Sequence, residues 1–388
     1  MTAALYSTEI ETPAFVYSES VLNSTASRIR SICEDADCRF LFSTKPACLS
    51  PIIEFLSDHV DGYSVSSRFD ALIVAGSKKL QQTIHHVSPA IKSDDFGDLT
   101  ELCNTITANS LRQAEALLAV GYNSEKVGLR INPDHSYLSD PRYDPCRKGS
   151  KLGIQLDMLP ESKSNEIRNI FSGVHIHNNC ESLDLNELRE TVDSVLSKAT
   201  WLFKHANWVN LGGGYFLNED LDTQPLVETV QRLKGEFGLD VFIEPGNAVV
   251  RDAGCLVATV LDVIEGGDCP IAILDTSVNH MPEVFEYQFQ PDVASETKDG
   301  DYKVILAGCS CLAGDCFGEY CFSEPIRVGK RIVFEKMGAY TISKWNFFNG
   351  INLPTIYSID STGNPVMQKK FSFRDYIFGS GADQIASF

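Results

Sequence analysis

Apolar residues before residue 250 gather in eight short runs, and each run is followed by a segment that can form a helix. The runs cover residues 39–44, 60–65, 83–87, 104–108, 127–131, 173–177, 208–211 and 241–244. Helical spacing of apolar residues is clearest in residues 110–120, 183–198 and 226–237. Eight strand–helix units predict a (β/α)8 barrel of the TIM type. A doubly wound open sheet is the alternative, although it does not require so regular a series.

Beyond residue 252 the pattern changes to strands without intervening helices. Strand-like runs cover residues 257–264, 271–275, 302–306 and 331–334, and Gly, Asp and Pro separate them. We therefore predict an α/β plus β fold, with a barrel over residues 23–251 and a C-terminal, mostly β domain over residues 252–388. Residues 1–22 contain a short strand at 13–17, and we expect this N-terminal strand to join the β domain.

The chain of 388 residues carries a formal net charge of -19. This charge argues against nucleic acid or an anionic membrane as a partner, and it is compatible with a cationic, amine-bearing substrate. The sequence has no apolar stretch of about 18 residues that would span a membrane, and its N-terminus lacks the pattern of a signal peptide. The 12 cysteines contain no CxxC pair, which speaks against a zinc site. We expect a cytoplasmic protein with reduced cysteines and no metal.

Catalytic groups of a barrel sit at the carboxyl ends of its strands, and Lys45 follows the first strand of this chain. A desolvated lysine loses its proton more readily, and the neutral amine can form a Schiff base with an aldehyde cofactor. Taken alone, Lys45 is better described as a solvated lysine just past a strand end. The residues at three other strand ends favour the cofactor.

These three strand ends carry a glycine run, a carboxylate and a histidine. The run Gly212-Gly213-Gly214 follows the seventh strand, where converging backbone N–H groups would suit a phosphate or form a flexible turn. Glu244 ends the eighth strand and would pair with a protonated pyridine nitrogen or with a structural cation. His177 shares a strand face with His175, and it would lie against a cofactor ring or belong to a hydrogen-bonded core. Together with Lys45, these groups describe a site for pyridoxal 5'-phosphate.

Short motifs along the rest of the chain point to one family. They are Gly173-Val174-His175-Ile176-His177 with Cys180-Glu181, Trp208-Val209-Asn210-Leu211 before the glycine run, Glu244-Pro245-Gly246, Leu274-Asp275-Thr276-Ser277 with His280-Met281-Pro282, Cys311-Leu312-Ala313-Gly314-Asp315, and Phe348-Asn349-Gly350. On these motifs, and over nearly its full length, the chain resembles the alanine racemase-fold (fold type III) decarboxylases that depend on pyridoxal phosphate. The motifs at 274–282 and 311–315 resemble more narrowly the carboxynorspermidine decarboxylases.

The resemblance implies how the cofactor would be held. Lys45 would bind it covalently, His177 would stack on its ring, and Glu244 would pair with its ring nitrogen. The remaining cofactor-binding residues would be Gly212, Gly213, Gly214, Gly246, Asn247 and Tyr340. Asn247 stands where some relatives place an arginine on the phosphate, so other groups would have to neutralise the phosphate in this chain.

The resemblance also implies a homodimer with shared active sites. Cys311 would protonate the carbon from which carbon dioxide leaves, and Cys311 and Asp315 would enter the site of the other subunit. The substrate-binding residues would be Glu181, Asp275, His280 and Asp315. Asp275 and Glu283 would recognise a distal amine.

Some positions depart from the family pattern. Thr44 and Pro46 flank Lys45, and Asn178-Asn179 lies beside the expected ring position, where we would expect other residues. The stretch 144–151 keeps a Pro-Cys…Gly-Ser core but carries Arg147, Lys148 and Lys151. Extra cations fit poorly with a polyamine, and they would suit a substrate that bears phosphate or carboxylate.

We therefore predict a carboxy-lyase that acts on an amino-acid-type substrate, with carboxynorspermidine or carboxyspermidine of polyamine biosynthesis preferred. The alternative is a decarboxylase of a natural-product pathway that acts on an aminocarboxypropyl-bearing conjugate. A racemase of the same fold would need a second base, usually tyrosine, in place of Cys311. A non-catalytic pyridoxal phosphate carrier resembles the barrel alone, and the C-terminal β domain argues against it.

Overall fold

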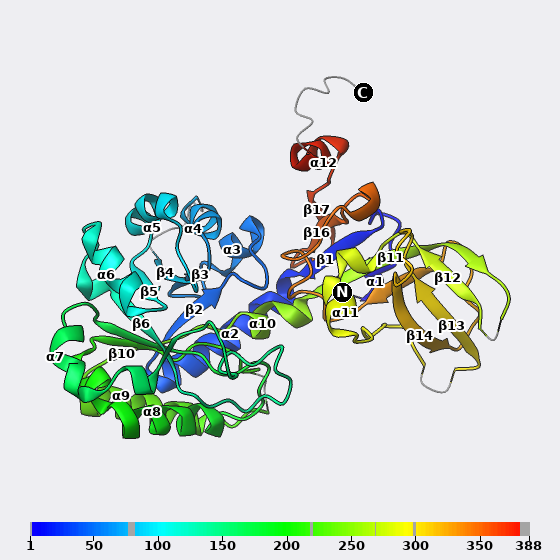
Figure 1. The fold of residues 1–388 in the computed structure, drawn as a ribbon. Coiled ribbons are helices and arrows are strands. Elements are labelled where there is room, and N and C mark those ends of the chain that lie inside the picture. The colour runs from blue at the N-terminus through cyan, green and yellow to red at the C-terminus, as the bar shows by residue number, and fades with distance from the viewer. Residues whose placement is uncertain (1, 77–81, 218–219, 268, 298–299, 381–388) are drawn as a thin grey trace. The chain divides into compact units, whose positions relative to one another are not determined.

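The computed structural model describes residues 2–76, 82–217, 220–267, 269–297 and 300–380 (Figure 1). The chain divides into two compact units, one formed by residues 23–249 and the other by residues 1–22 together with 250–388. Among the described residues, no helix has the length and apolar character needed to cross a membrane.

The first unit is a closed barrel of eight parallel strands. These strands are β2 (Arg39–Ser43), β3 (Gly62–Val65), β4 (Thr83–Val87), β5 (Thr105–Ala108), β6 (Val127–Asn132), β8 (Gly173–Ile176), β9 (Trp208–Asn210) and β10 (Asp240–Ile243). The sheet closes because β10 pairs with β2 and β5 pairs with β6. The two-residue strand β7 (Ile154–Gln155) adds to β6. The predicted (β/α)8 barrel is therefore confirmed, and the alternative of an open sheet is wrong.

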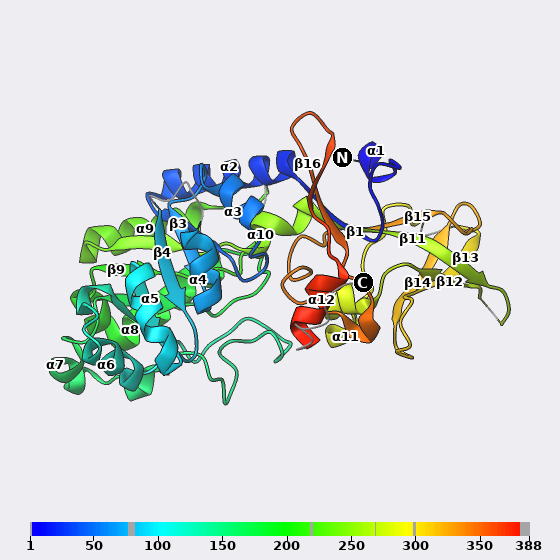
Figure 2. The ribbon, with the colours of Figure 1, turned by 90° about the horizontal axis from the view of Figure 1, so that it is seen from above.

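Helices surround the barrel strands, as Figures 1 and 2 show. They are α2 (Glu19–Ala36), α3 (Ser50–Leu56), α4 (Arg68–Ala75), α5 (Phe96–Leu102), α6 (Leu111–Ala119), α7 (Ser164–Ile167), α8 (Asn186–His205), α9 (Gln224–Phe237) and α10 (Asn247–Val250). The bounds follow local chemistry. The Ser110 side chain accepts the backbone N–H of Gln113 at the start of α6, and Gly238 ends α9 with a left-handed φ of 72°.

The Trp208 side chain packs with Leu41 and Phe242 in a cluster of buried residues. Two strands make room for the indole by carrying glycine. A Cβ atom on Gly173 would lie 2.0 Å from Cε2 of Trp208, and one on Gly128 would lie 2.5 Å from its Cη2. The glycines are therefore required by the packing of one large side chain.

Replacing Gly173 by alanine is expected to lower the free energy of unfolding by about 1–3 kcal/mol, because the added methyl group must displace Trp208 in a close-packed interior. Urea unfolding followed by circular dichroism measures this change. Gly235→Ala is the matched control: a Cβ on Gly235 in α9 meets no atom within 4 Å, and alanine is the better helix former. Equal destabilisation by the two variants would contradict the packing argument.

His86 in β4 is a buried base without a full set of partners. Its side chain is 1 % exposed, and no group in the described structure bonds its Nδ1. Burial lowers the pKa of His86 to about 4. In the unfolded chain the pKa of histidine is about 6.5, so between these values the unfolded state binds more protons than the folded state. The folded state therefore loses stability as the pH falls from about 6.5 to about 4.

The variant His86→Gln does not titrate in this range and is expected to flatten the acid limb of the stability curve. Between pH 7 and pH 4 the free energy of unfolding falls in both proteins. The fall should be smaller in the variant than in the parent protein by up to about 3 kcal/mol. Chemical unfolding at a series of pH values gives both curves. His205→Gln, at an exposed position, should leave the slope of the parent protein in place. Parallel curves for His86→Gln and the parent would show that His86 does not contribute.

The second unit is mostly β. Its strands are β1 (Ala14–Ser18), β11 (Gly254–Ile264), β12 (Ile271–Leu274), β13 (Tyr302–Ala307), β14 (Cys316–Phe322), β15 (Arg331–Phe334), β16 (Thr355–Ile359) and β17 (Pro365–Lys369), and its helices are α1 (Thr2–Leu5), α11 (Pro282–Tyr287) and α12 (Phe373–Ser380). The sheet order is β14-β13-β12-β11-β1-β16-β17, with β15 paired to β11. The N-terminal strand β1 thus lies between β11, which is antiparallel to it, and β16, which is parallel to it. The mostly β character predicted for the C-terminal part is confirmed.

Candidate active site

Polar side chains collect inside the barrel toward the carboxyl ends of its strands. Alternate residues of a strand point to the same side, and this rule brings side chains from β3, β4, β8 and β9 around Glu244, which follows β10. They are Ser64, His85, His175 and Asn210. Glu244 itself was predicted at this position, and its partners come from four other strands.

Glu244 is a nearly buried carboxylate with an organised set of contacts. Asn210 donates a hydrogen bond from Nδ2 to Oε1 at 2.5 Å, and Nε2 of His175 lies 3.5 Å from Oε2. Burial alone would raise the pKa of the Glu244 carboxyl. Hydrogen bonding and charge interaction with His175, followed by hydrogen bonding with Ser64, outweigh burial and lower this pKa to about 2. The barrel therefore holds an anion that can pair with a protonated ring nitrogen.

Lys45 follows β2 and is exposed at the mouth of the barrel. The backbone N–H of the preceding Thr44 donates to the carbonyl of Ser64 at 2.9 Å, which continues the pairing with β3 up to the lysine. Although the amine can be reached from the mouth, the surrounding strands remove much of its water. This burial, followed by the positive charge of Arg130, lowers the pKa of Lys45, while Glu244 and Cys180 oppose the shift. A lysine with a lowered pKa provides more of the neutral amine that a Schiff base needs.

Arg130 is a site residue that the sequence reasoning missed. It lies in β6, is 8 % exposed, and donates from Nη2 to the carbonyl of His177 at 3.5 Å. Burial lowers the pKa of Arg130, but a guanidinium remains charged in proteins. The signal was present in the sequence, because Arg130 is the one charged residue in the apolar run 127–131. A permanent cation therefore stands beside Lys45.

Close neighbours leave no room for side chains in the glycine run after β9, and two of its three backbone amides already donate hydrogen bonds within the barrel. Gly212 and Gly214 have φ of 71° and 96°, and a Cβ on Gly213 would lie 2.3 Å from the carbonyl oxygen of Glu244. The N–H of Gly212 donates to Oδ1 of Asn210 at 2.8 Å, and the N–H of Gly213 donates to Nδ1 of His177 at 3.0 Å. Of the three amides predicted to bind a phosphate, the N–H of Gly214 is therefore the one without an acceptor in the described structure.

Asn247 and Glu181 are brought together after β10 and β8. Nδ2 of Asn247 donates to Oε1 of Glu181 at 2.6 Å, and Glu181 has a positive φ of 56°. The buried Oδ1 of Asn247 has no partner within the described chain. Gly246 is packed against β2, because a Cβ there would lie 3.0 Å from that of Ser43. An unsatisfied buried amide oxygen marks a polar position that a ligand can complete.

The other predicted residues lie in the second unit, where Asp315 organises the loop that carries Cys311. Oδ1 of Asp315 accepts the N–H of Val278 at 2.8 Å, and Oδ2 accepts the N–H of Ser310 at 3.0 Å and its hydroxyl. Cys311 is exposed, and its N–H donates to Oδ1 of Asn349 at 2.9 Å. The carboxylate of Asp315 therefore has three donors of its own and fixes the position of the exposed thiol.

His280 and Asp275 also have partners within their unit. His280 is 1 % exposed and shares a hydrogen bond of 2.9 Å between Nδ1 and the hydroxyl of Thr276. Burial lowers the pKa of His280 to about 4, so the ring is neutral at pH 7. Asp275 accepts the N–H of Thr259 at 2.8 Å on Oδ1. The carboxylate expected to bind a distal amine is therefore engaged in its own sheet.

Tyr340 and Glu283, which we expected to contact phosphate and amine, surround a lysine of the same unit. Nζ of Lys344 lies 2.8 Å from Oε1 of Glu283 and 2.8 Å from Oε2 of Glu286. The same ammonium lies 5.1 Å from the ring centre of Tyr287 and 5.5 Å from that of Tyr340. The two acids and two rings form a cage that an internal cation already fills.

Comparison with known proteins identifies the class. Residues 14–338 match the family described as pyridoxal-dependent decarboxylase, C-terminal sheet domain. The chain belongs to this family of pyridoxal-dependent decarboxylases, and it is therefore a carboxy-lyase.

Particular relatives narrow this class. The chain is 30% identical over 388 residues to carboxynorspermidine/carboxyspermidine decarboxylase of Campylobacter jejuni, covering 95% of this chain and 98% of that one. It is 32% identical over 377 residues to carboxyaminopropylagmatine decarboxylase of Synechocystis, covering 95% of each chain. The crystal structure of carboxynorspermidine decarboxylase from Campylobacter jejuni complexed with norspermidine superposes with a TM-score of 0.86 at 29% identity, over 95% of this chain and 100% of that one.

Proposed function

We propose that the chain uses pyridoxal phosphate to remove the carboxylate from an aminocarboxypropyl group carried on the nitrogen of a larger molecule. Carboxynorspermidine, carboxyspermidine and carboxyaminopropylagmatine share this group, and they are the compounds after which the relatives are named. The observation that carries the proposal is the ionised Glu244 at the centre of contacts from four strands, beside the exposed amine of Lys45.

The residues of the barrel fit the cofactor. Lys45 would hold it covalently, Glu244 would accept the proton-bearing ring nitrogen, and His177 would lie against the ring. The free N–H of Gly214 would donate to the phosphate, and Asn247 would do so only if its Nδ2 left Glu181. When bound, pyridoxal phosphate supplies an electron sink for the bond that is cleaved. Arg130 would add a fixed positive charge that favours the neutral amine of Lys45.

The second unit would supply the proton. Cys311 is exposed on a loop whose backbone is hydrogen-bonded to Asp315. We propose that this loop enters the barrel mouth of a second subunit, so that the enzyme works as a homodimer with shared active sites. The thiol would then hold a proton for the carbon from which carbon dioxide has left.

Purified protein loaded with pyridoxal phosphate is expected to release carbon dioxide from carboxynorspermidine or carboxyspermidine. For each carbon dioxide released, one molecule of the corresponding triamine should form. In heavy water the product should carry one deuterium on the carbon that lost the carboxylate. Inversion of the amino acid without release of carbon dioxide would show a racemase and contradict the proposal.

Cys311→Ala is expected to lower kcat about 10²-fold, because a positioned general acid contributes at least this factor. Steady-state release of carbon dioxide measures the loss. Cys316→Ala is the matched control, since Cys316 is a second exposed thiol of the same unit, and it should retain the parent kcat. Equal activity of the two variants would exclude the Cys311 thiol as the proton donor.

A further inference from the structure

The long loop between β6 and β7, residues 133–153, follows the carboxyl end of β6, and Lys45 follows the carboxyl end of β2. Because the barrel strands are parallel, both stand at the same end of the barrel. Hydrogen bonds to the barrel anchor the loop at both ends. Nδ2 of Asn132 donates to the carbonyl of Leu152 at 3.2 Å, the N–H of Gly153 donates to Oδ1 of Asn109 at 2.7 Å, and Nδ2 of Asn178 donates to the carbonyl of His135 at 3.2 Å. Because Asn178 directly follows His177, the loop is tied to the strand end that carries the predicted ring-stacking residue.

The tip of this loop is ordered by its own hydrogen bonds and is docked into the barrel. The hydroxyl of Ser150 donates to the carbonyl of Pro145 at 2.5 Å, and the N–H of Ser150 donates to the carbonyl of Arg147 at 2.9 Å. The Cys146 side chain is 7 % exposed. Burial raises the pKa of its thiol to about 12, and the positive charge of Arg130 opposes this shift. The residues that follow Cys146 therefore lie at the rim of the mouth.

These rim residues are cations without acidic partners. Arg147, Lys148 and Lys151 are exposed, and no ion pair joins them to a described residue of the chain. Of the three acids of the loop, Asp140 pairs through Oδ2 with Arg142 at 2.7 Å, and Asp144 accepts the N–H of Cys146 at 2.8 Å on Oδ1. The third, Asp134, is exposed and forms no ion pair with these cations in the described structure. In a chain with a net charge of -19, this cluster gives the mouth a local charge opposite to that of the whole.

One pair of acidic residues that would recognise a cationic tail already holds a cation of its own unit. Lys344 bridges Glu283 and Glu286, and Asp275 accepts a backbone N–H. A substrate ammonium at Glu283 would have to displace an ammonium that the chain supplies itself. The exposed cations on the rim therefore carry the inference about the charge of the missing ligand.

We propose that the substrate carries an anionic group, a phosphate or a carboxylate, at the end of its tail, and that Arg147 and Lys148 bind this group. The inference rests on the proposed function, which defines the aminocarboxypropyl head of the substrate. It adds the charge of the tail at the other end of the substrate. Arginine and lysine at a rim act mainly through charge, so the preference should weaken as salt screens it.

Four substrates test the inference. All carry the aminocarboxypropyl head on nitrogen and a three-carbon tail, and they differ in the end group: ammonium, which is carboxynorspermidine itself, methyl, carboxylate or phosphonate. We expect kcat/KM for the better anionic tail to exceed that for the ammonium tail at least about tenfold at low ionic strength. The carboxylate and phosphonate arms distinguish the two kinds of anion.

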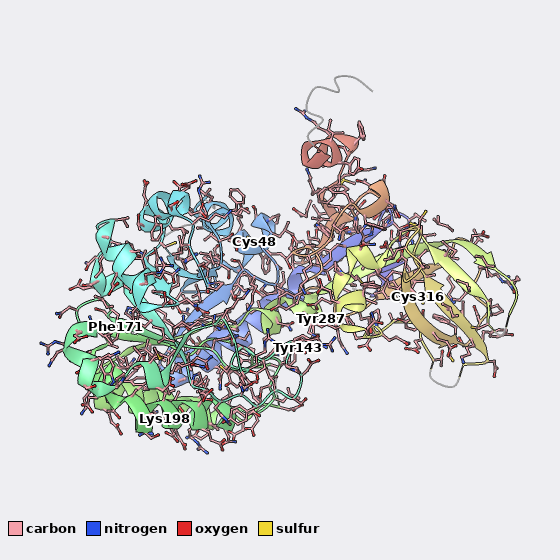
Figure 3. All side chains as sticks on the ribbon, in the orientation of Figure 1. Cys48, Tyr143, Phe171, Lys198, Tyr287 and Cys316 are labelled. Atoms are coloured by element: carbon pink, nitrogen blue, oxygen red, sulfur yellow. The ribbon has the colours of Figure 1, made fainter. Side chains whose placement is uncertain are left out.

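The double variant Arg147→Glu/Lys148→Glu is expected to reverse this order of preference while kcat on the methyl-tailed substrate stays within about twofold. The control Lys198→Glu/Lys204→Glu changes the net charge equally on α8; both its lysines are exposed, and Figure 3 shows Lys198 away from Tyr143 of the loop. The control should keep the parent order.

The inference is overturned if the parent enzyme prefers the ammonium tail, or if both double variants respond in the same way. In either case the proposed function stands. If none of the four substrates, the methyl-tailed one included, releases carbon dioxide, the proposed head chemistry fails and the inference falls with it.

Discussion

The variant Lys45→Ala is expected to be colourless after incubation with pyridoxal phosphate and dialysis, with no absorbance near ~420 nm, because no amine remains at the mouth to hold the aldehyde. Release of carbon dioxide should fall by more than about 10³-fold, since the covalent anchor and its position are lost together. Absorbance spectra and carbon dioxide release measured on one preparation test both parts.

Lys198→Ala is the matched control. It removes an exposed lysine from α8 and should keep both the colour and the rate. If Lys45→Ala stays yellow after dialysis, and borohydride still links the cofactor covalently, another lysine is the anchor and the assignment of Lys45 is wrong.

Glu244→Gln is expected to lower kcat about 10³-fold with little change in KM. The amide can still accept the hydrogen bond from Nδ2 of Asn210, so the barrel should remain folded. It carries no charge, however, and so it cannot hold a positively charged ring nitrogen. The cofactor would bind but would lose much of its capacity to withdraw electrons.

Kinetics with carboxynorspermidine and the other three tail analogues, together with cofactor absorbance, separate a loss of chemistry from a loss of binding. Glu228→Gln removes an exposed carboxylate on α9 that pairs with Arg189, and it should leave kcat within about twofold of the parent. Full activity of Glu244→Gln would mean that the ring nitrogen needs no anionic partner in this enzyme.

The barrel could be predicted from the sequence because its strands are apolar on both faces and are separated by helices. Such runs are long enough to be recognised without knowledge of their neighbours. The strands β14, β16 and β17 were not predicted, and for β14 and β17 their composition explains why. β17 is polar and largely exposed, and β14 mixes Gly and Glu with aromatic residues. Their pairing with β13 and β16 decides their conformation, and pairing is not visible in a local pattern.

The site was predictable where chemistry coincides with a strand end, as for Lys45 and Glu244. Arg130 was missed because a single arginine in an apolar run points into or out of a barrel depending on register, which the run itself does not show. The use of the Gly212 and Gly213 amides by Asn210 and His177 was equally hidden. Hydrogen-bond partners from different strands meet only once the barrel has closed.

The position of β1 between β11 and β16 has a consequence for the order in which the protein is made. A ribosome releases β1 at the start of translation, whereas its parallel neighbour begins at Thr355. The whole barrel sequence emerges in the interval, and domains generally fold as they emerge. The N-terminal strand can therefore pair with β11 only after the barrel sequence has been made, and its other edge stays open until nearly the last codons have been read.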